Sequence, residues 1–420
     1  MISKGYSYRK ISGILFFLFI LSVGLHKSNY LINQLSGVNI ESIIGITLLA
    51  FPLLFLFLSY YYSPSRRIYS IKRKDSFVVN IIFFYVHCLL VYGVIRGNDL
   101  SSLFQEYWTS LVILLAYKIS SEDYIWKMFE GKLRITFFVF AGLVFLGRSY
   151  TLEHLSVLGY DALETGNTTA VLSYTMAPML DFWPFLFLLP FFNKEKKVRN
   201  KILIFLPLIV YLGFQLYFLK RAPSARAISF LILATAINMK ITGNSKIFIR
   251  QIFLLGTIAS LMFVFTPEAL VKRFQTKDTA RQDEAVQMIS QLSVYELLIG
   301  RGLGGDYVVN QGGIVQFIDN KGKPVSTSVH IGAVYPILKG GFFFFFLVLF
   351  HILSTVYKSA IRIKELSSRE LSCLVFLIIY SLFRLIEGPL TPGSVFDALL
   401  FGMSLGYLNR KSENIKPNII

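Results

Sequence analysis

The sequence predicts an all-α fold, a polytopic transmembrane helical bundle of about 12 spans with one large outward-facing loop that contains short helices. Three observations predict it. The 420 residues are 54% hydrophobic but only 16% charged, whereas roughly 25% of the residues of an average soluble domain are charged. Apolar runs near the roughly 20 residues that span a bilayer recur along the chain. One long polar segment interrupts them late in the sequence.

The apolar runs give the expected spans. They cover residues 9–27, 42–62, 76–95, 102–119, 133–148, 175–192, 202–219, 227–241, 252–267, 341–357, 371–386 and 395–409. Cys88 and Cys373 both fall inside these runs, so we expect no disulfide framework.

The orientation of the bundle follows from its basic residues, because Lys and Arg are retained on the cytoplasmic side of a membrane. With the basic N-terminus inside, the basic segments 66–74, 194–201, 358–369 and 410–416 are inside as well. Both termini are then cytoplasmic. The net charge of +18 is explained mainly by this topology, and because no basic soluble face is present, we expect no nucleic-acid partner.

We expect a single integral membrane domain over residues 1–420, with a smaller outward loop at 149–174 and a larger one at 268–340. Within the larger loop, helical spacing predicts a helix from Asp283 to Leu298. Its apolar stripe would lie on the bilayer surface or cap a cavity. The sequence predicts a loop for residues 306–328. The stripe consists of Ala285, Met288, Ile289, Leu292 and Leu297.

Arginines on the outward side are exceptions to the charge rule and therefore candidates for function. Arginine carries a permanent charge and planar donors that bind phosphate oxygens in pairs. A set converging on one anionic substrate would suit a lipid-linked pyrophosphate, whereas the structural alternative is pairing with headgroups or with acidic residues such as Asp283 and Glu284. The candidates are Arg221, Arg226, Arg273, Arg281 and Arg301.

Two further features of the larger loop could carry chemistry. The cluster from Gly300 to Gly305 resembles a phosphate-binding loop, in which Gly302 and Gly304 would let backbone N–H groups approach an anion. A tight turn is the alternative. His330 follows where the chain returns to the membrane and could act as a general base or fill a structural role.

Charged residues inside the expected spans support a rival hypothesis. Asp181 and Asp397 would fit a proton-coupled transporter, and Arg384 and Glu387, three residues apart on one helix, predict a local ion pair. No spacing of His, Cys, Asp or Glu suggests a metal site. We expect neither a metal nor another cofactor.

The order of motifs in the larger loop resembles that of the O-antigen polymerase/O-antigen ligase superfamily. Arg281 comes first, then Ile299–Gly304 with alternating glycines, then His330, then Leu338-Lys339-Gly340-Gly341. The motif resemblance covers about residues 281–341, and the resemblance in architecture covers the whole chain. An Arg stands inside the glycine motif, and Ile331 stands where the family often has Asn after the His.

This resemblance implies a metal-independent glycosyltransferase at the periplasmic face of the bacterial inner membrane. Undecaprenyl-diphosphate-linked oligosaccharides would be its substrates, beside membrane lipids and a separate chain-length regulator as partners. His330, Arg281 and Arg301 would be catalytic, and Arg221, Arg226, Arg273, Gly302 and Gly304 would bind the diphosphate. We expect an O-antigen polymerase. The alternatives are an O-antigen ligase that transfers glycan to the lipid A core and a lipid-linked oligosaccharide flippase or other transporter.

Overall fold

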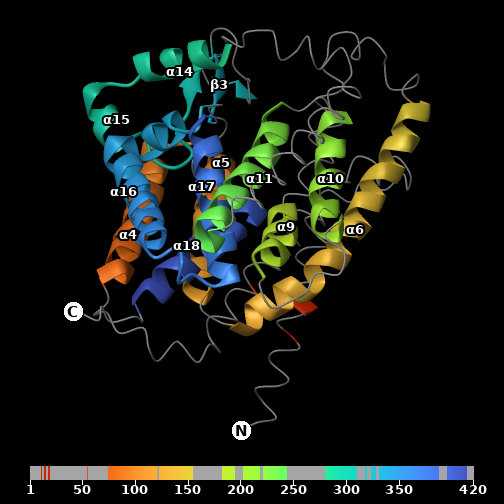
Figure 1. Ribbon diagram of the computed structural model, residues 1–420. Helices are drawn as coiled ribbons and strands as arrows, with labels where there is room; N and C mark the ends of the chain where they lie inside the picture. Colours follow the sequence, from red (N-terminus) through yellow and green to blue (C-terminus); the bar gives the residue numbers. More distant parts are fainter. Residues whose placement is uncertain are drawn as a thin grey trace, which may run out of the picture. The chain divides into compact units, whose positions relative to one another are not determined.

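The computed structural model describes a mostly helical chain (Figure 1). The residues described are 11, 14–15, 18, 54, 74–120, 123–154, 182–193, 202–217, 221–243, 280–309, 317–318, 323–327, 331–386 and 395–413.

The chain divides into two compact units. The first contains residues 1–66, 122–275 and 367–372, and the second contains residues 67–121, 276–366 and 373–420. The expectation of a single integral membrane domain stays a prediction. The whole motif region, residues 281–341, belongs to the second unit.

The first unit contains α6 (Asp123–His154), α9 (Trp183–Phe192), α10 (Ile202–Tyr217) and α11 (Arg221–Thr242). Aromatic side chains pack α9 against its neighbours: the Trp183 ring lies 4.7 Å from that of Tyr211 and 5.3 Å from that of Phe230. The first residues of α17 (Ser368–Ile386) also belong to this unit, where Arg369 binds Asp123 and Glu130 of α6, each at 2.8 Å. The basic start of α17 is therefore fastened to α6.

The second unit is built on α4 (Lys74–Arg96), α5 (Leu100–Ile119), α16 (Val334–Ile361), the rest of α17 and α18 (Val395–Glu413). Helices α5 and α18 approach very closely because Gly402 and Gly406 of α18 face α5. A Cβ on Gly402 would collide with the Ile113 carbonyl, and one on Gly406 with the Tyr117 carbonyl. Two small residues four apart are a common device for close packing of membrane helices.

A polar segment, which we call the cap (residues 280–327), lies across one end of α4, α5 and α16, shown in teal in Figure 1. It contains α14 (Ala280–Ser290), α15 (Val294–Ile299) and a small antiparallel sheet in the order β1-β3-β2. The strands are β1 (Tyr307–Val308), β2 (Phe317–Ile318) and β3 (Pro324–Ser326). The prediction of a loop over 306–328 was therefore wrong at these strands, which are too short to give a sequence signal.

The predicted helix from Asp283 to Leu298 is interrupted and forms two helices, α14 and α15. Ser293 is the N-cap of α15 and forms a capping box with Glu296, so a new helix starts there. Most of the predicted apolar stripe is buried within the second unit rather than exposed. Ala285, Met288 and Leu292 are buried against Tyr307, Val309 and the start of α16, and Leu297 packs on the same cluster. Ile289 is exposed.

A described helix coincides with every expected span except 9–27, 42–62 and 252–267, which lie largely outside the described residues. Within the described part of the chain, three helical segments are long and apolar enough to cross a membrane. They are Phe77–Arg96, Pro223–Thr242 and Val334–Ile361. The predicted full set of about 12 spans and the periplasmic position of the larger loop belong to the proposal below.

Candidate functional site

The glycine turn, residues 300–305, joins α15 to the sheet and lies against the helices of the second unit. The Arg301 amide donates to the Leu338 carbonyl of α16 at 2.7 Å, and the Gly302 amide donates to Lys339 at 2.9 Å. The Leu303 amide donates to Leu89 of α4 at 3.2 Å. Gly302 has a φ of 81°, and a Cβ there would lie 2.8 Å from the backbone nitrogen of Gly93. The turn thus touches both helices through its backbone.

Every backbone amide of the glycine turn already has an acceptor. Beyond the three amides above, Gly300 donates to the Glu296 carbonyl at 2.7 Å and Gly305 to the Gly302 carbonyl at 3.1 Å. Gly304 donates to the Glu106 carboxylate of α5 at 2.7 Å. In this conformation the turn has no amide left for a phosphate, so the alternative of a tight turn describes it. Phosphate binding at Gly302 and Gly304 stays a prediction.

Arg301 is committed to contacts within the cap. Its guanidinium donates to the carbonyls of Asp306 and Gln291, both at 2.6 Å, and pairs with Glu296 at 3.1 Å. Its side chain is only 15% exposed. In this arrangement Arg301 closes the turn between α15 and β1, and a diphosphate would have to compete with three existing partners.

Glu296 connects the cap to α4. Besides Arg301, it pairs with Arg96 at the end of α4, and it receives the backbone amide of Ser293. Partial burial opposes its ionisation, but the Ser293 amide and the two guanidinium groups hold the pKa of the Glu296 carboxyl at about 2. The carboxylate therefore stays charged at any physiological pH.

Beneath the turn lies a buried ion pair that the sequence analysis did not identify. Lys339 of α16, 1% exposed, places its Nζ 2.6 Å from Glu106 Oε1 and 2.7 Å from the Gly305 carbonyl. The second Glu106 oxygen accepts the Gly304 amide, and the Tyr335 hydroxyl also binds this carboxylate. One acidic and one basic side chain thus hold both ends of the Gly304-Gly305 peptide.

A second buried carboxylate lies inside the cap itself. Glu284 of α14, 1% exposed, accepts a hydrogen bond of 2.5 Å from the Tyr307 hydroxyl. Burial and the neighbouring carboxylate raise the pKa of the Tyr307 hydroxyl well above its usual range. Of the two carboxylates considered for activation of an acceptor, Glu284 is thus enclosed, whereas Asp283 is exposed.

The other predicted site residues are distributed over both units. Arg281 lies in the first turn of α14, in the second unit, and Arg221 and Arg226 lie at the start of α11, in the first unit. Arg273 and His330 lie outside the described residues. The convergence of these side chains on one substrate therefore stays a prediction.

The charges inside the expected spans include an ion pair between two helices, and the predicted local pair of Arg384 with Glu387 stays a prediction. Arg384 of α17 binds Asp397 of α18 at 2.5 Å and stacks over the Tyr380 ring at 5.0 Å, whereas Glu387 lies outside the described residues. The described pair is thus an interhelical one. Glu106 could have been found by the same signal, because it lies inside the expected span 102–119 and a charged residue inside an apolar run needs a partner. Lys339 lies in the segment expected to be the larger loop, where that signal does not apply.

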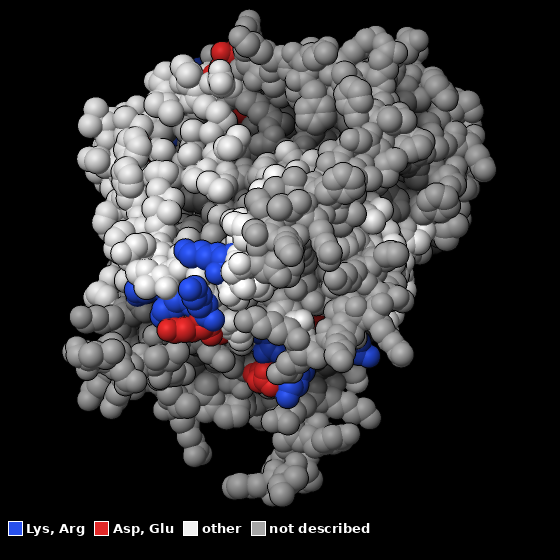
Figure 2. Space-filling model, viewed as in Figure 1, with Lys and Arg blue, Asp and Glu red and all other residues white. Residues whose placement is uncertain are grey.

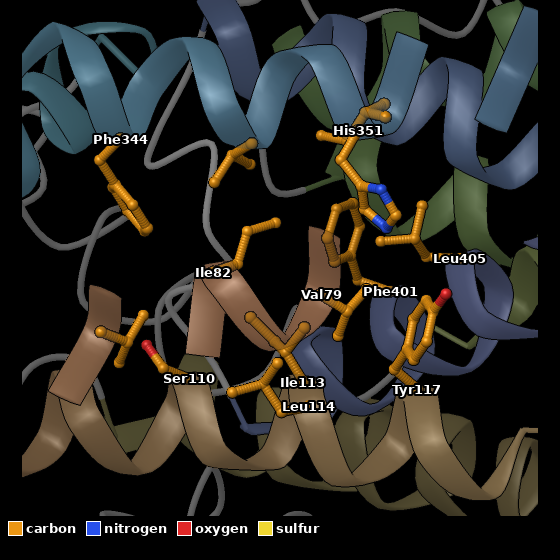
Figure 3. A pocket seen from close by; sticks show the side chains of 13 residues that line it. Val79, Ile82, Ser110, Ile113, Leu114, Tyr117, Phe344, His351, Phe401 and Leu405 are labelled. Carbon is orange, nitrogen blue, oxygen red and sulfur yellow. The ribbon is translucent and has the colours of Figure 1, made fainter. Parts of the chain in front are cut away.

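An apolar pocket lies between α4, α5, α16 and α18, all within the second unit (Figure 3). Hydrocarbon side chains form most of its wall, with Phe344 and Ser110 toward one end and His351 and Tyr117 toward the other. Thr355 donates to Asn409 at 2.9 Å, and the Asn409 amide nitrogen lies 3.3 Å from His351 Nε2. Such a pocket accommodates an apolar chain rather than a charged group.

Over the described residues, no group of three or more His, Cys, Asp or Glu side chains is placed to bind a metal ion. Comparison of the chain with models of known protein families, with curated proteins and with solved structures finds no match.

Proposed function

We propose that this protein is an O-antigen polymerase, which joins undecaprenyl-diphosphate-linked oligosaccharide repeat units at the periplasmic face of the bacterial inner membrane. The observation that carries the proposal is the folding of the motif-bearing segment. Its described parts from Arg281 to Thr327 form the cap, which contacts α4, α5 and the Leu338–Lys339 motif residues of α16 through the glycine turn. A polar cap on an apolar helical unit suits a substrate with a polar glycan and a lipid tail.

The reaction needs little more than positioning and charge stabilisation. A sugar hydroxyl of the acceptor attacks the anomeric carbon of the donor glycan while the bond from that carbon to the diphosphate oxygen breaks. The acceptor proton passes to a base, for which we propose His330, and undecaprenyl diphosphate leaves. Arginines stabilise the negative charge that develops on the departing diphosphate. No metal enters this scheme.

Within the proposal, the arginines have unequal roles. Arg301 is occupied by Glu296 and two carbonyls, so we assign it to positioning the cap rather than to direct contact with the diphosphate. Arg281, in the first turn of α14, remains the leading candidate of the second unit. Arg221, Arg226 and Arg273 complete the pool of candidates.

The distribution of charge supports the proposed orientation. On the face drawn in Figure 2, described Lys and Arg side chains lie mainly in the lower part of the view, together with Asp and Glu side chains beside them. At the far end of α16 from the cap, Lys358, Arg362 and Lys364 follow one another closely. Basic residues at that end favour a cytoplasmic side there and a periplasmic cap.

Two alternatives remain distinguishable. A ligase would use the same donor site but transfer the glycan to the lipid A core. A transporter would use Asp181 and Asp397 as proton carriers. Asp181 lies outside the described residues, and the ion pair of Asp397 with Arg384 provides a structural reason for the presence of Asp397. We therefore rank the transporter below both enzymes.

The decisive experiment uses a strain that lacks this protein, complemented with wild type, Arg281→Ala or Arg281→Lys. We expect a ladder of glycan lengths on a gel with wild type and a core bearing a single repeat unit with Arg281→Ala. The lysine variant should restore the ladder only in part, because bidentate binding is lost. Bare core in the deletion strain would contradict a polymerase and indicate a ligase or flippase.

Two controls separate chemistry from folding. Gln282→Ala changes the exposed neighbour of Arg281 on α14 and should leave the ladder intact. The amount of each variant in isolated membranes must equal that of wild type. Arg301→Ala is unsuitable as the primary test because it removes three contacts that hold the cap together.

A further inference from the structure

The outer faces of α14 and α15 carry large apolar side chains that nothing in the described protein covers. On α15, Val294 is 78% exposed, Tyr295 62% and Leu298 56%. On α14, Val286 is 67% exposed and Ile289 40%. We propose that this surface, which we call the outer apolar face, is seated in the headgroup region of the bilayer that α4 and α16 cross.

The outer apolar face is distinct from the side that holds the cap together. The inner side of the same two helices is already occupied by Ala285, Met288 and Leu292, which pack on the sheet and on α16. Within one turn of α15, Val294, Tyr295 and Leu298 are spaced so that they share a face. A short helix with apolar residues on both sides needs a second apolar environment in addition to the protein core.

The outer apolar face continues the exposed surface of the helices on which the cap rests. The last turns of α4 expose Val91, Val94 and Ile95, and the first half of α16 exposes Phe343 and Phe346. Both helices are among those long and apolar enough to cross a membrane.

A charge contact holds α15 beside α4, and a close backbone contact holds it beside α16. Glu296 of α15 pairs with Arg96 at the end of α4, and the Leu298 carbonyl lies so close to Gly341 of α16 that no Cβ would fit there. Lipid that surrounds the cap end of α4 and α16 would therefore also contact α15 (Figure 1).

The charges on α15 do not oppose this position. Its one acidic side chain, Glu296, is neutralised by Arg96 and Arg301, and the other residues of the helix are Val294, Tyr295, Leu297, Leu298 and Ile299. Tyr295 has the mixed character of residues that concentrate at the boundary between membrane and water. A helix of this composition lies in the plane of the interface.

Such a position would fix the height of the cap over the bilayer. The glycine turn follows α15 directly, so an anchored α15 holds the turn at the level of the lipid headgroups. The inference stands on exposure and continuity and does not depend on the proposed activity.

The test is site-directed spin labelling of the whole protein in lipid nanodiscs. Cys88 and Cys373 are first replaced by Ser and Ala, and single cysteines are then introduced as Val294→Cys and Leu298→Cys. Phe346→Cys on α16 serves as the lipid reference, and Lys323→Cys, at an exposed position directly before β3, serves as the water reference. Collision with oxygen reports lipid, and collision with a water-soluble nickel chelate reports water.

We expect the ratio of oxygen to nickel accessibility at positions 294 and 298 to be several-fold above that at position 323 and below that at position 346, as for side chains in the headgroup region. A ratio equal to that at position 323 would overturn the proposal. Low access to both reagents would also overturn it, because that outcome means a protein, such as a second copy of this chain, covers the face.

If the cysteine-free protein does not fold, hydroxyl-radical labelling of the unmodified protein asks the same question. Tyr295 should be oxidised several-fold less in nanodiscs than a tyrosine of similar exposure in water, and equal oxidation would contradict a lipid environment.

Discussion

Two contacts in the second unit depend on glycine, but for different reasons. At the seam between α5 and α18, Gly402 and Gly406 keep ordinary helical geometry and are needed only because a side chain would collide with the backbone of α5. At the glycine turn, Gly302 is needed for the same reason and also for its φ of 81°. The turn is held in addition by the buried pair of Glu106 and Lys339, which has no counterpart in the contacts of the seam described above.

The difference shows how two kinds of packing are achieved in one helical unit. At the seam, Gly402 and Gly406 allow a close approach to the backbone of α5, so these two contacts depend on shape. The turn brings polar backbone against the ends of apolar helices, where every N–H and C=O must find a partner. Substitutions at the turn should therefore cost more than substitutions of similar size at the seam.

The largest effect is expected for Lys339→Met. The change leaves Glu106 buried without its cation and the Gly305 carbonyl without its donor, which should lower the free energy of unfolding by about 4 kcal/mol. Thermal unfolding of purified protein in detergent, followed by tryptophan fluorescence, measures the loss.

The double variant Glu106→Gln with Lys339→Met is the control for this prediction. It removes both charges, so it should recover part of the stability that the single variant loses. If the single variant unfolds at the wild-type temperature, the pair does not hold the turn.

The next largest effect is expected for Gly302→Ala. An alanine at positive φ is strained, and its Cβ would press on the backbone of Gly93 at 2.8 Å, so we expect a loss of about 3 kcal/mol. The unfolding midpoint of this variant should lie below that of Gly406→Ala. The reverse order would contradict the distinction drawn between the turn and the seam.

Gly406→Ala should have a smaller effect, about 2 kcal/mol, because the helix geometry is already suitable for alanine and only overpacking remains. Gly213→Ala on α10 is the matched control, since no described atom lies within 4 Å of its added Cβ. It should leave the midpoint unchanged or raise it slightly, because alanine favours helix. A loss at Gly213 as large as at Gly406 would mean that glycine substitutions destabilise these helices without any collision.

Much of the helical architecture could be predicted from the sequence because hydrophobicity alone carries it. The runs at 76–95 and 341–357 coincide with α4 and with most of α16. The kink of α16 at Gly341 could not be predicted in detail, since it depends on the Leu298 carbonyl that arrives from the cap. The sheet was missed for a related reason: strands of two or three residues form through pairing with distant residues, which leaves no local pattern.

The sequence predicted which residues belong to the candidate site but not which residues they contact. The glycine cluster and Arg301 were recognised, yet their chemistry was read from phosphate-binding loops, whereas the structure shows their donors engaged with Leu338, Lys339 and Glu106. The side-chain partners of Arg301 lie within ten residues of it, but Glu106 lies almost two hundred residues from Gly304. A contact of that kind is set by the tertiary arrangement of α5 and the cap, which no motif records.

The smallest effect is expected for the ion pair between Glu296 of α15 and Arg96 of α4. The pKa of Glu296 is about 2 in the folded protein, against 4.5 ordinarily, so its contribution to stability is fully present above pH 4.5. That contribution is lost as the pH falls from 4.5 through about 2. After a discount for solvent access, we expect Glu296→Gln to cost about 1 kcal/mol at pH 7 and the difference from wild type to shrink over this acidic window. Unfolding by denaturant at several pH values in both proteins measures it, and a difference that stays constant down to pH 2 would show that the charge of Glu296 does not stabilise the link.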